Sequence, residues 1–338
     1  MYRKIMGFLE AWKESKHRKP LILQGARQVG KTYSILEFGR THYENVAYFN
    51  FETNPKLNET FEENISPDYL IPILSHIAGQ TIVKEKTLMV FDEVQLCERA
   101  LTSLKYFCEN APDYHIIVAG SLLGVAVNRA KFSFPVGKVD MKTLYPMDME
   151  EFMLALGEDD LVKQIKKCFQ TDTPLPSALH DAAMQLYRQY LVVGGMPECV
   201  MQFAGTKDYI LVRHTQDTIL ASYLNDMSKY NTLNEIKKTR LAYDNITVQL
   251  TKKNTRFQYK LIKKGGRASE FENAIEWLCL SGIVSQVYKV EQIKKPLENY
   301  RDIDAFKIYV SDLGLLCAKK DLAANDILYM VEEINDFK

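Results

Sequence analysis

The chain has 338 residues and is 46% hydrophobic, which is enough for two or three domains that each bury a core. Lysine and arginine total 43, aspartate and glutamate also total 43, and the formal net charge is therefore zero. This balance gives no support to a globally basic nucleic-acid binder, so any basic surface must be local.

The six cysteines are scattered and form no C-x-x-C pair, which argues against a disulfide framework or a zinc site. The amino terminus lacks an apolar segment of signal-peptide length. The longest nearly apolar run, residues 116–127, contains two glycines and is too short to span a bilayer. These features predict a soluble cytoplasmic protein without a membrane partner.

Residues 1–16 have the apolar spacing of an amphipathic helix, with Ile5, Leu9 and Trp12 on one face together with Phe8. A basic link, residues 16–19, follows this helix. It could touch a nucleotide, but a solvated turn is the favoured interpretation.

The next segment is an apolar run, residues 20–23, followed by a sequence that fits G-x-x-x-x-G-K-S/T without deviation. Glycines at both ends let successive N–H groups point into one concavity that holds phosphate oxygens. The lysine then reaches the β- and γ-phosphates, the threonine hydroxyl is a ligand for Mg²⁺, and the following helix adds its positive end. We expect this helix to end at Gly39. The predicted nucleotide-binding residues are Gly25, Ala26, Arg27, Gln28, Val29, Gly30, Lys31, Thr32 and Tyr33.

Residues 46–51 read as a second strand, and a helical region continues from there to about Gly79. A third strand, residues 87–91, runs directly into Asp92 and Glu93. In a protein with a phosphate loop, the first carboxylate of such a pair holds Mg²⁺ and the second orients the attacking water. We therefore predict Asp92 as a metal ligand and Glu93 as the catalytic base.

A helix over residues 99–110 leads to a fourth strand, residues 114–121, which ends at Ser121. Its hydroxyl would lie beside the phosphate loop and could sense the γ-phosphate, although it could equally cap the next helix. Residues 139–144 supply a fifth strand. Strands that alternate with helices predict an α/β fold, a parallel sheet with helices on both faces. An extra strand between those that carry the loop and the acid pair is typical of ATPases that use a glutamate.

From residue 147 to about residue 230 the pattern is helical, with one interruption at residues 192–197. Two glycines and Pro197 make this interruption a tight turn. One interpretation places Pro197 against the adenine ring, and the other is a plain turn between helices.

Residues 252–267 carry seven basic residues, no acidic one, and two aromatic residues among them. Ser269 and Glu272 then have the spacing of a capping box that opens a helix ending at Gly282. Residues 283–290 and 306–310 read as two strands. Helices followed by a β-hairpin are typical of a winged helix, and its basic stretch could contact DNA phosphates. A solvated basic face, or a surface that docks another subunit, is the alternative.

These motifs resemble one family. The loop Gly25–Thr32, the acid pair at 92–93, the pair Gly120-Ser121 and the turn 194–198 are similar to the predicted AAA+-superfamily ATPases of bacteria and archaea, which are related to the signal-transduction ATPases with numerous domains. The resemblance covers nearly the whole chain. It implies a phosphate-loop ATPase core at 1–146, a helical lid at 147–230, and a winged-helix domain at 231–338. It also implies that Pro197 packs near adenine.

The sequence departs from this family at two places. Members often carry Gly-Arg where this chain has Gly137-Lys138, so no arginine finger is assigned; Arg129, Lys131 and Lys138 are candidates. Members also usually continue into a domain that resembles restriction-type nucleases. This sequence ends at Lys338 before such a domain, so a fragment of a longer protein is one interpretation.

The predicted function is Mg²⁺-dependent ATP binding and hydrolysis, coupled to movement of the winged helix, with ATP and ADP as ligands. The predicted catalytic residues are Lys31, Glu93 and Ser121, and the predicted metal ligands are Thr32 and Asp92. A DNA-binding regulator with negligible turnover is the second hypothesis. A small-molecule kinase is disfavoured by the acid pair and by the missing arginine-rich lid. A homo-oligomer is compatible with the sequence but is not assigned by it.

Overall fold

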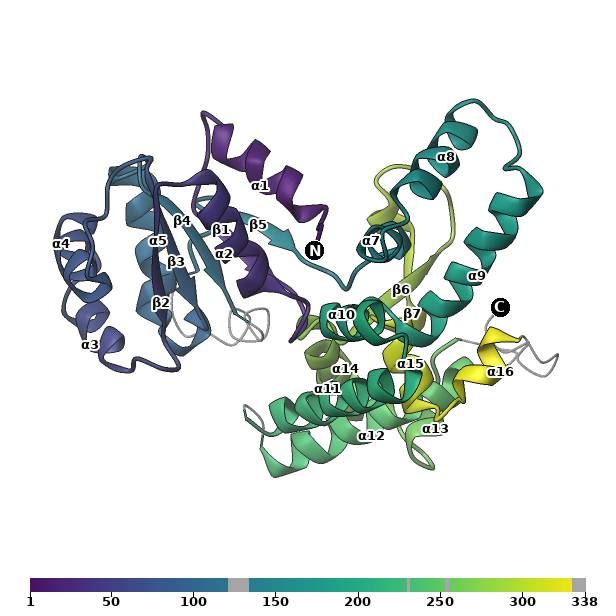
Figure 1. Ribbon diagram of the computed structural model, residues 1–338. Helices are drawn as coiled ribbons and strands as arrows, with labels where there is room; N and C mark the ends of the chain where they lie inside the picture. Colours follow the sequence, from purple (N-terminus) through teal and green to yellow (C-terminus); the bar gives the residue numbers. More distant parts are fainter. Residues whose placement is uncertain (121–133, 230–231, 253–255, 330–338) are drawn as a thin grey trace. The chain divides into compact units, whose positions relative to one another are not determined.

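A computed structural model of the protein describes residues 1–120, 134–229, 232–252 and 256–329. The chain divides into two compact units, Tyr2–Tyr145 and Pro146–Lys338, and Met1 belongs with the second (Figure 1). Of the helices in the described ranges, none has the length and apolar content needed to cross a membrane. The division of the second unit into a lid and a winged-helix domain stays a prediction.

The first unit alternates strands and helices. Its elements are α1 (Ile5–Glu14), β1 (Leu21–Gln24), α2 (Lys31–His42), β2 (Asn45–Asn50), α3 (Lys56–Glu63), α4 (Pro67–Ala78), β3 (Thr87–Asp92), the 3₁₀ turn η1 (Val94–Leu96), α5 (Glu98–Asn110), β4 (His115–Ala119) and β5 (Asp140–Thr143). All neighbouring strands pair in parallel, in the order β2-β3-β4-β1-β5. The predicted α/β fold with a five-stranded parallel sheet is therefore confirmed.

Both faces of this sheet are covered. Alternate strand residues, such as Ile22, Phe91 and Val118, pack into a core with α3, α4 and α5. The residues between them, such as Leu23 and Val90, are also fully buried. Because side chains alternate along a strand, the second set faces the other side, where α2 lies (Figure 1). Near-continuous apolar strands are what a parallel sheet with two covered faces requires.

The prediction that Gly39 ends the first helix after the loop is wrong. Helix α2 continues to His42, and Gly39 lies buried inside it. A Cβ at this position would stand 2.5 Å from Val46 Cγ2 and 3.1 Å from Leu88 Cδ2. The glycine therefore lets the helix approach the sheet closely, and it does not interrupt the helix.

The second unit is mainly helical. Its elements are α7 (Met149–Ala155), α8 (Asp159–Gln170), α9 (Ser177–Val193), α10 (Pro197–Thr206), α11 (Tyr209–Lys229), α12 (Leu233–Leu250), α13 (Tyr259–Ile262), α14 (Ala268–Leu280), β6 (Val284–Val290), the 3₁₀ turn η2 (Leu297–Tyr300), β7 (Arg301–Val310), α15 (Leu313–Lys319) and α16 (Ala324–Leu328). The two strands pair antiparallel. The second strand begins already at Arg301, inside the stretch that the sequence predicts to be a loop.

The glycine turn between α9 and α10 is a packing joint. A Cβ on Gly195 would lie 1.9 Å from the carbonyl oxygen of Met147, and a Cβ on Gly194 would lie 2.3 Å from Asp312 Oδ1. The buried Asp312 carboxylate accepts hydrogen bonds from the N–H groups of Gly195, at 2.6 Å, and Leu315, at 2.8 Å. These contacts tie the turn to the segment after β7 and explain both glycines without a ligand.

The predicted capping box of Ser269 and Glu272 is wrong. Helix α14 begins at Ala268, and Arg267 is its N-cap without a side-chain cap. The chain arrives there through Gly265, with φ 77°, and Gly266, whose Cβ would stand 2.6 Å from the carbonyl oxygen of Tyr259. This close packing starts the helix earlier than the local spacing of Ser269 and Glu272 suggests.

Candidate phosphate-loop site

The loop between β1 and α2 has the backbone conformation that its glycines permit. Gly25 has φ 147° and Gly30 has φ 88°. A Cβ on Gly25 would lie 2.2 Å from the carbonyl oxygen of Leu144, so no larger residue fits there. Gln28 also has a positive φ, 65°. The loop therefore curls tightly into the amino end of α2, where N–H groups and the helix dipole favour an anion.

Lys31 lies in the first turn of α2, and its side chain folds back over the loop. Its ammonium group donates hydrogen bonds to the carbonyl oxygens of Gly25 and Ala26, both at 2.8 Å. The side chain is buried although it is charged. These contacts hold one positive charge at the loop, where it can neutralise phosphate oxygens.

Asp92, at the end of β3, lies at the centre of a hydrogen-bond network. Thr32 Oγ1 donates to Asp92 Oδ2 at 2.9 Å, and the Tyr48 hydroxyl donates to the same oxygen at 2.7 Å. The backbone N–H of Glu93 donates to Asp92 Oδ1 at 3.0 Å. Burial raises the pKa of Tyr48 to about 12, and its hydrogen bond to Asp92 acts in the same direction. Tyr48 is thus a neutral donor that orients the carboxylate.

Thr32 and Asp92 fit a magnesium ion. Their oxygens lie 2.9 Å apart. Neighbouring oxygen ligands in a Mg²⁺ octahedron with bonds of about 2.0–2.1 Å are about 2.8–3.0 Å apart. Within the described part of the chain, no cluster of three or more His, Cys, Asp or Glu residues could hold a metal. A hydroxyl and one carboxylate suit Mg²⁺, which usually takes its remaining ligands from water and phosphate.

Glu93 follows Asp92 in a left-handed backbone conformation, with φ 51°. This conformation is uncommon for a residue with a side chain and is often found at functional sites. Its carboxylate accepts a hydrogen bond from the side-chain amide of Gln95 in the 3₁₀ turn η1. The Glu93 side chain is therefore oriented by a neighbour and stays partly exposed.

The sheet order explains why these residues meet. Strand β4 lies between β1, which precedes the loop, and β3, which ends in Asp92. All three strands are parallel, so their carboxyl ends share one edge of the sheet. The structure brings together the predicted residues from Gly25 to Thr32 with Asp92. Tyr33 is exposed on the first turn of α2.

Two residues at this site were not predicted from the sequence. Tyr48 reaches Asp92 because β2 and β3 are neighbours, and the sequence alone does not show which strands pair. Arg3 is buried and donates to the carbonyl oxygens of Val29, at 2.9 Å, and Tyr145, at 2.8 Å. Arg3 thus holds the loop by hydrogen bonds from the amino-terminal segment. It belongs to no recognisable sequence motif.

Other predicted residues are not at this site or are not described. Ser121, Arg129 and Lys131 lie outside the described residues. Lys138 precedes β5, so it lies at the opposite edge of the sheet, where it pairs with Glu109 at 2.9 Å. Pro197 is the first residue of α10 in the second unit, and its contact with adenine stays a prediction.

Comparison with known proteins identifies two segments. Residues 17–153 match a family described as an AAA domain, and residues 184–326 match a domain of unknown function (DUF8612). None of the curated proteins matches the chain.

Solved structures show only distant similarity. The Aeropyrum pernix ORC2 protein, solved in ADPNP and ADP complexes, is 12% identical with a TM-score of 0.44, over 98% of this chain and 94% of that chain. The Thermotoga maritima RuvB Holliday junction branch migration motor is 13% identical with a TM-score of 0.34, over 83% and 87%.

C. elegans PCH-2 is 11% identical with a TM-score of 0.34, over 61% of this chain and 63% of that chain, which is less than two thirds of its length. All three TM-scores are below 0.5, so these similarities define neither the whole architecture nor the function. The family match contains the complete phosphate loop and the acid pair. Residues 17–153 thus combine similarity to an AAA domain with a parallel sheet and a curled phosphate-loop backbone.

Proposed function

We propose that this protein is a Mg²⁺-dependent ATPase whose nucleotide site is the loop from Gly25 to Tyr33. The observation that carries this proposal is the hydrogen bond between Thr32 and Asp92, because it joins the phosphate loop to the acid pair across the sheet edge. Separate structural roles for the loop and the acid pair would not require these two oxygens to meet. The AAA domain match of residues 17–153 supports the same assignment.

Each residue has a role that follows from its chemistry. The loop N–H groups bind phosphate oxygens, and Lys31 neutralises charge on the β- and γ-phosphates. Thr32 and Asp92 would hold Mg²⁺, which lowers the charge repulsion around the triphosphate when it is bound. Glu93 orients a water molecule and accepts its proton as it attacks the γ-phosphate. Ser121 is the proposed γ-phosphate sensor, because it follows β4 closely in the sequence.

Two substitutions test this function. Lys31→Ala should abolish tight binding of a fluorescent ATP analogue, because it removes the charge at the loop. Glu93→Gln should bind the analogue normally but lose turnover by about 100-fold or more, since an amide cannot accept the proton. Unchanged turnover in Glu93→Gln would remove that residue from its role. Failure of the unaltered protein to bind any purine nucleotide at millimolar concentration would refute the proposal.

A nucleotide-gated DNA binder remains the second candidate, and one observation favours it. Lys252, Arg256, Lys260, Lys263, Lys264 and Arg267 are all exposed. Helices α12, α13 and α14 followed by the β6–β7 hairpin have the element order of a winged helix, and the N–H of Phe257 pairs with the carbonyl oxygen of Phe306 at 2.8 Å beside the hairpin. ATP turnover measured with and without duplex DNA across a salt series separates the candidates. Binding through this stretch should weaken steeply as salt rises.

A further inference from the structure

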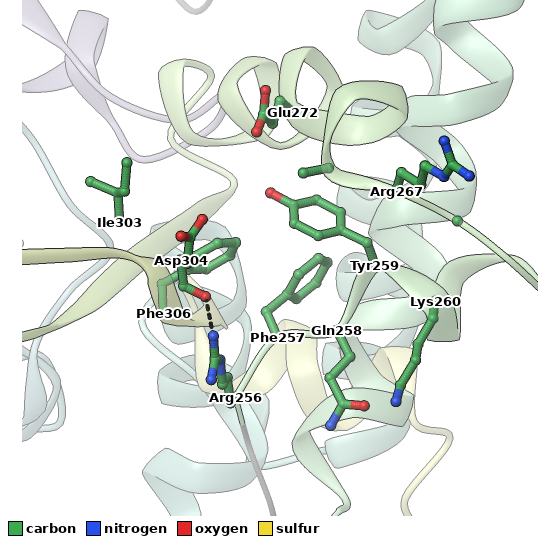
Figure 2. Close-up of a pocket in the computed structure, with 12 residues that line it drawn as sticks. Arg256, Phe257, Gln258, Tyr259, Lys260, Arg267, Glu272, Ile303, Asp304 and Phe306 are labelled. Carbon is green, nitrogen blue, oxygen red and sulfur yellow. Dashed lines mark hydrogen bonds between the residues drawn. The ribbon is translucent and has the colours of Figure 1, made fainter.

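A cavity in the second unit is lined by two carboxylates and by the basic residues Arg256, Lys260 and Arg267. It has a volume of about 540 Å³ and lies between the start of α14 and the first residues of β7 (Figure 2). Glu272 and Ala268 line it from α14, and Ile303 and Asp304 line it from β7. None of the residues that line this cavity belongs to the proposed nucleotide site.

The inner wall of the cavity is aromatic. Phe257, Tyr259 and Phe306 all line it. Phe257 stacks on Phe306 with ring centroids 5.4 Å apart, and Tyr259 meets both rings edge-on, at 5.4 Å and 6.1 Å. Phe257 and Phe306 are nearly buried, whereas Tyr259 keeps part of its surface open. Aromatic faces carry partial negative charge and attract cations.

Two carboxylates lie on one side of the opening of the cavity. Figure 2 shows the hydroxyl of Tyr259 directed between Glu272 and Asp304, while Arg267 and Lys260 extend away from this opening. Burial raises the pKa of Tyr259 to about 12, and the charges of Glu272 and Asp304 act in the same direction. Among the residues that the structure describes, neither carboxylate has an ion-pair partner. Arg256 instead donates to the backbone carbonyl of Asp304, at 2.8 Å.

A fourth aromatic residue, Tyr288, extends this cluster and already contacts a guanidinium group of the chain. Tyr288 packs against Phe306 with ring centroids 5.8 Å apart, and Arg301 lies over the Tyr288 ring at 4.3 Å. An arginine can therefore occupy a ring face in this cluster in the folded protein. The ring and hydroxyl of Tyr259, on the cavity side of the cluster, offer a second place of the same kind.

We propose that this cavity binds an arginine side chain from a basic segment of a partner protein. The planar guanidinium can stack on Tyr259 while its N–H groups reach Glu272 and Asp304, which a lysine ammonium cannot do from one position. The exposed Ile303 can cover the arginine methylenes. Arg256, Lys260 and Arg267 also line the cavity, but beside Tyr259 a nucleic-acid phosphate would meet two carboxylates, so it fits less well there.

The experiment uses the full chain and a short fluorescent peptide with one arginine in a glycine-serine background. Binding is measured by anisotropy at low ionic strength, beside matched peptides that carry lysine or citrulline. We expect the arginine peptide to bind most tightly and the citrulline peptide, which is neutral but similar in shape, to bind at least 10-fold more weakly. Glu272→Gln should weaken arginine binding about 10-fold, and Asp304→Asn should act in the same direction.

Glu276→Gln is the matched control, because Glu276 is exposed one turn further along α14 and does not line the cavity. It removes the same charge and should leave the arginine peptide unaffected. Equal loss in Glu272→Gln and Glu276→Gln would overturn the proposal, because only general charge attraction would remain. Equal binding of the citrulline peptide would also overturn it. So would a single-stranded oligonucleotide whose binding strengthens in Glu272→Gln but not in Glu276→Gln, because that result would place nucleic acid at this cavity.

Discussion

At the scale of single residues, the candidate site depends on how one carboxylate is held. Asp92 is buried, and hydrogen bonds from Thr32, Tyr48 and the Glu93 backbone reach both of its oxygens. A buried carboxylate with several donors is fixed in orientation, which a magnesium ligand requires. Thr32 is itself a proposed ligand, so Tyr48 is the residue that can be removed to test orientation alone.

Tyr48→Phe removes this donor and leaves the ring. We expect the apparent affinity for Mg²⁺, measured by metal titration in the presence of a fluorescent ATP analogue, to fall about 10-fold, since outer partners of metal ligands have effects of this size. The free energy of unfolding should change by less than about 1 kcal/mol, because Tyr48 is partly exposed. Tyr2→Phe, at an exposed tyrosine in the same unit, is the control. Equal Mg²⁺ affinity in both variants would remove Tyr48 from the site.

Asp312 gives the second unit a pH-dependent stability. Burial raises its pKa from 3.8 to about 6, although the N–H groups of Gly195, Leu315 and Gly314 lower it. A carboxyl with a higher pKa in the folded state binds its proton more tightly there than in the unfolded chain. The contribution of this raised pKa to the free energy of unfolding is therefore complete below pH 3.8, and it is lost as the pH rises through about 6.

We expect the free energy of unfolding of the natural protein, relative to Asp312→Asn, to rise by about 2–3 kcal/mol from pH 7.5 to pH 4. Chemical denaturation at several pH values measures this difference, and the subtraction removes contributions from other carboxylates. A difference that does not change with pH would mean that the folded Asp312 titrates like an exposed aspartate.

The sequence indicates only part of the site at this scale. Lys31, Thr32, Asp92 and Glu93 are found by local spacing, because the phosphate loop and the end of β3 are each a continuous stretch. Tyr48 and Arg3 are not, because their contacts depend on which strands are neighbours and on where the amino terminus packs. Residue spacing along the chain carries neither piece of information.

At the scale of helices and strands, periodicity finds the elements, and packing decides where they end. The five strands of the sheet and the β6–β7 hairpin follow from apolar patterns in the sequence. Gly39 reads as a helix end but is a contact point with the sheet, and Ser269 reads as a cap but lies inside α14. Two capping boxes, at Asp148 and Thr232, went unpredicted because their spacing is common and carries no packing information.

Gly195→Ala tests the packing joint between α9 and α10. Its added methyl would stand 1.9 Å from the Met147 carbonyl, and backbone cannot move aside as a flexible side chain can. We expect a loss of about 1–3 kcal/mol in the free energy of unfolding. Gly205→Ala, inside α10 with nothing within 4 Å of its Cβ, is the matched control and should gain about 0.5 kcal/mol. Equal changes in the free energy of unfolding for Gly195→Ala and Gly205→Ala, measured by denaturant titration, would contradict the close packing of the turn against Met147.

At the scale of the whole molecule, the chain consists of two units that offer different chemistry. The first, Tyr2–Tyr145, holds the phosphate loop and the acid pair. The second carries the exposed basic residues of 252–267, the cavity beside α14, and Pro197. The net charge of zero for the whole chain therefore does not show that basic residues cluster in the second unit. The loop of the first unit can therefore be tested by itself, through its response to the phosphate part of a nucleotide.

Calorimetry with ATP and with inorganic tripolyphosphate, each with Mg²⁺, is this test. At 100 times its dissociation constant, a ligand stabilises the state that it binds by about 2.7 kcal/mol, or roughly 10 °C in Tm for a domain of this size. Both ligands should raise the transition of the first unit, because the loop binds phosphate. In Lys31→Ala neither ligand should move either transition. If neither ligand moves the transition of the first unit in the unaltered protein, the loop does not bind phosphate, and the hydrogen bond from Thr32 to Asp92 serves only the packing of the loop against the sheet.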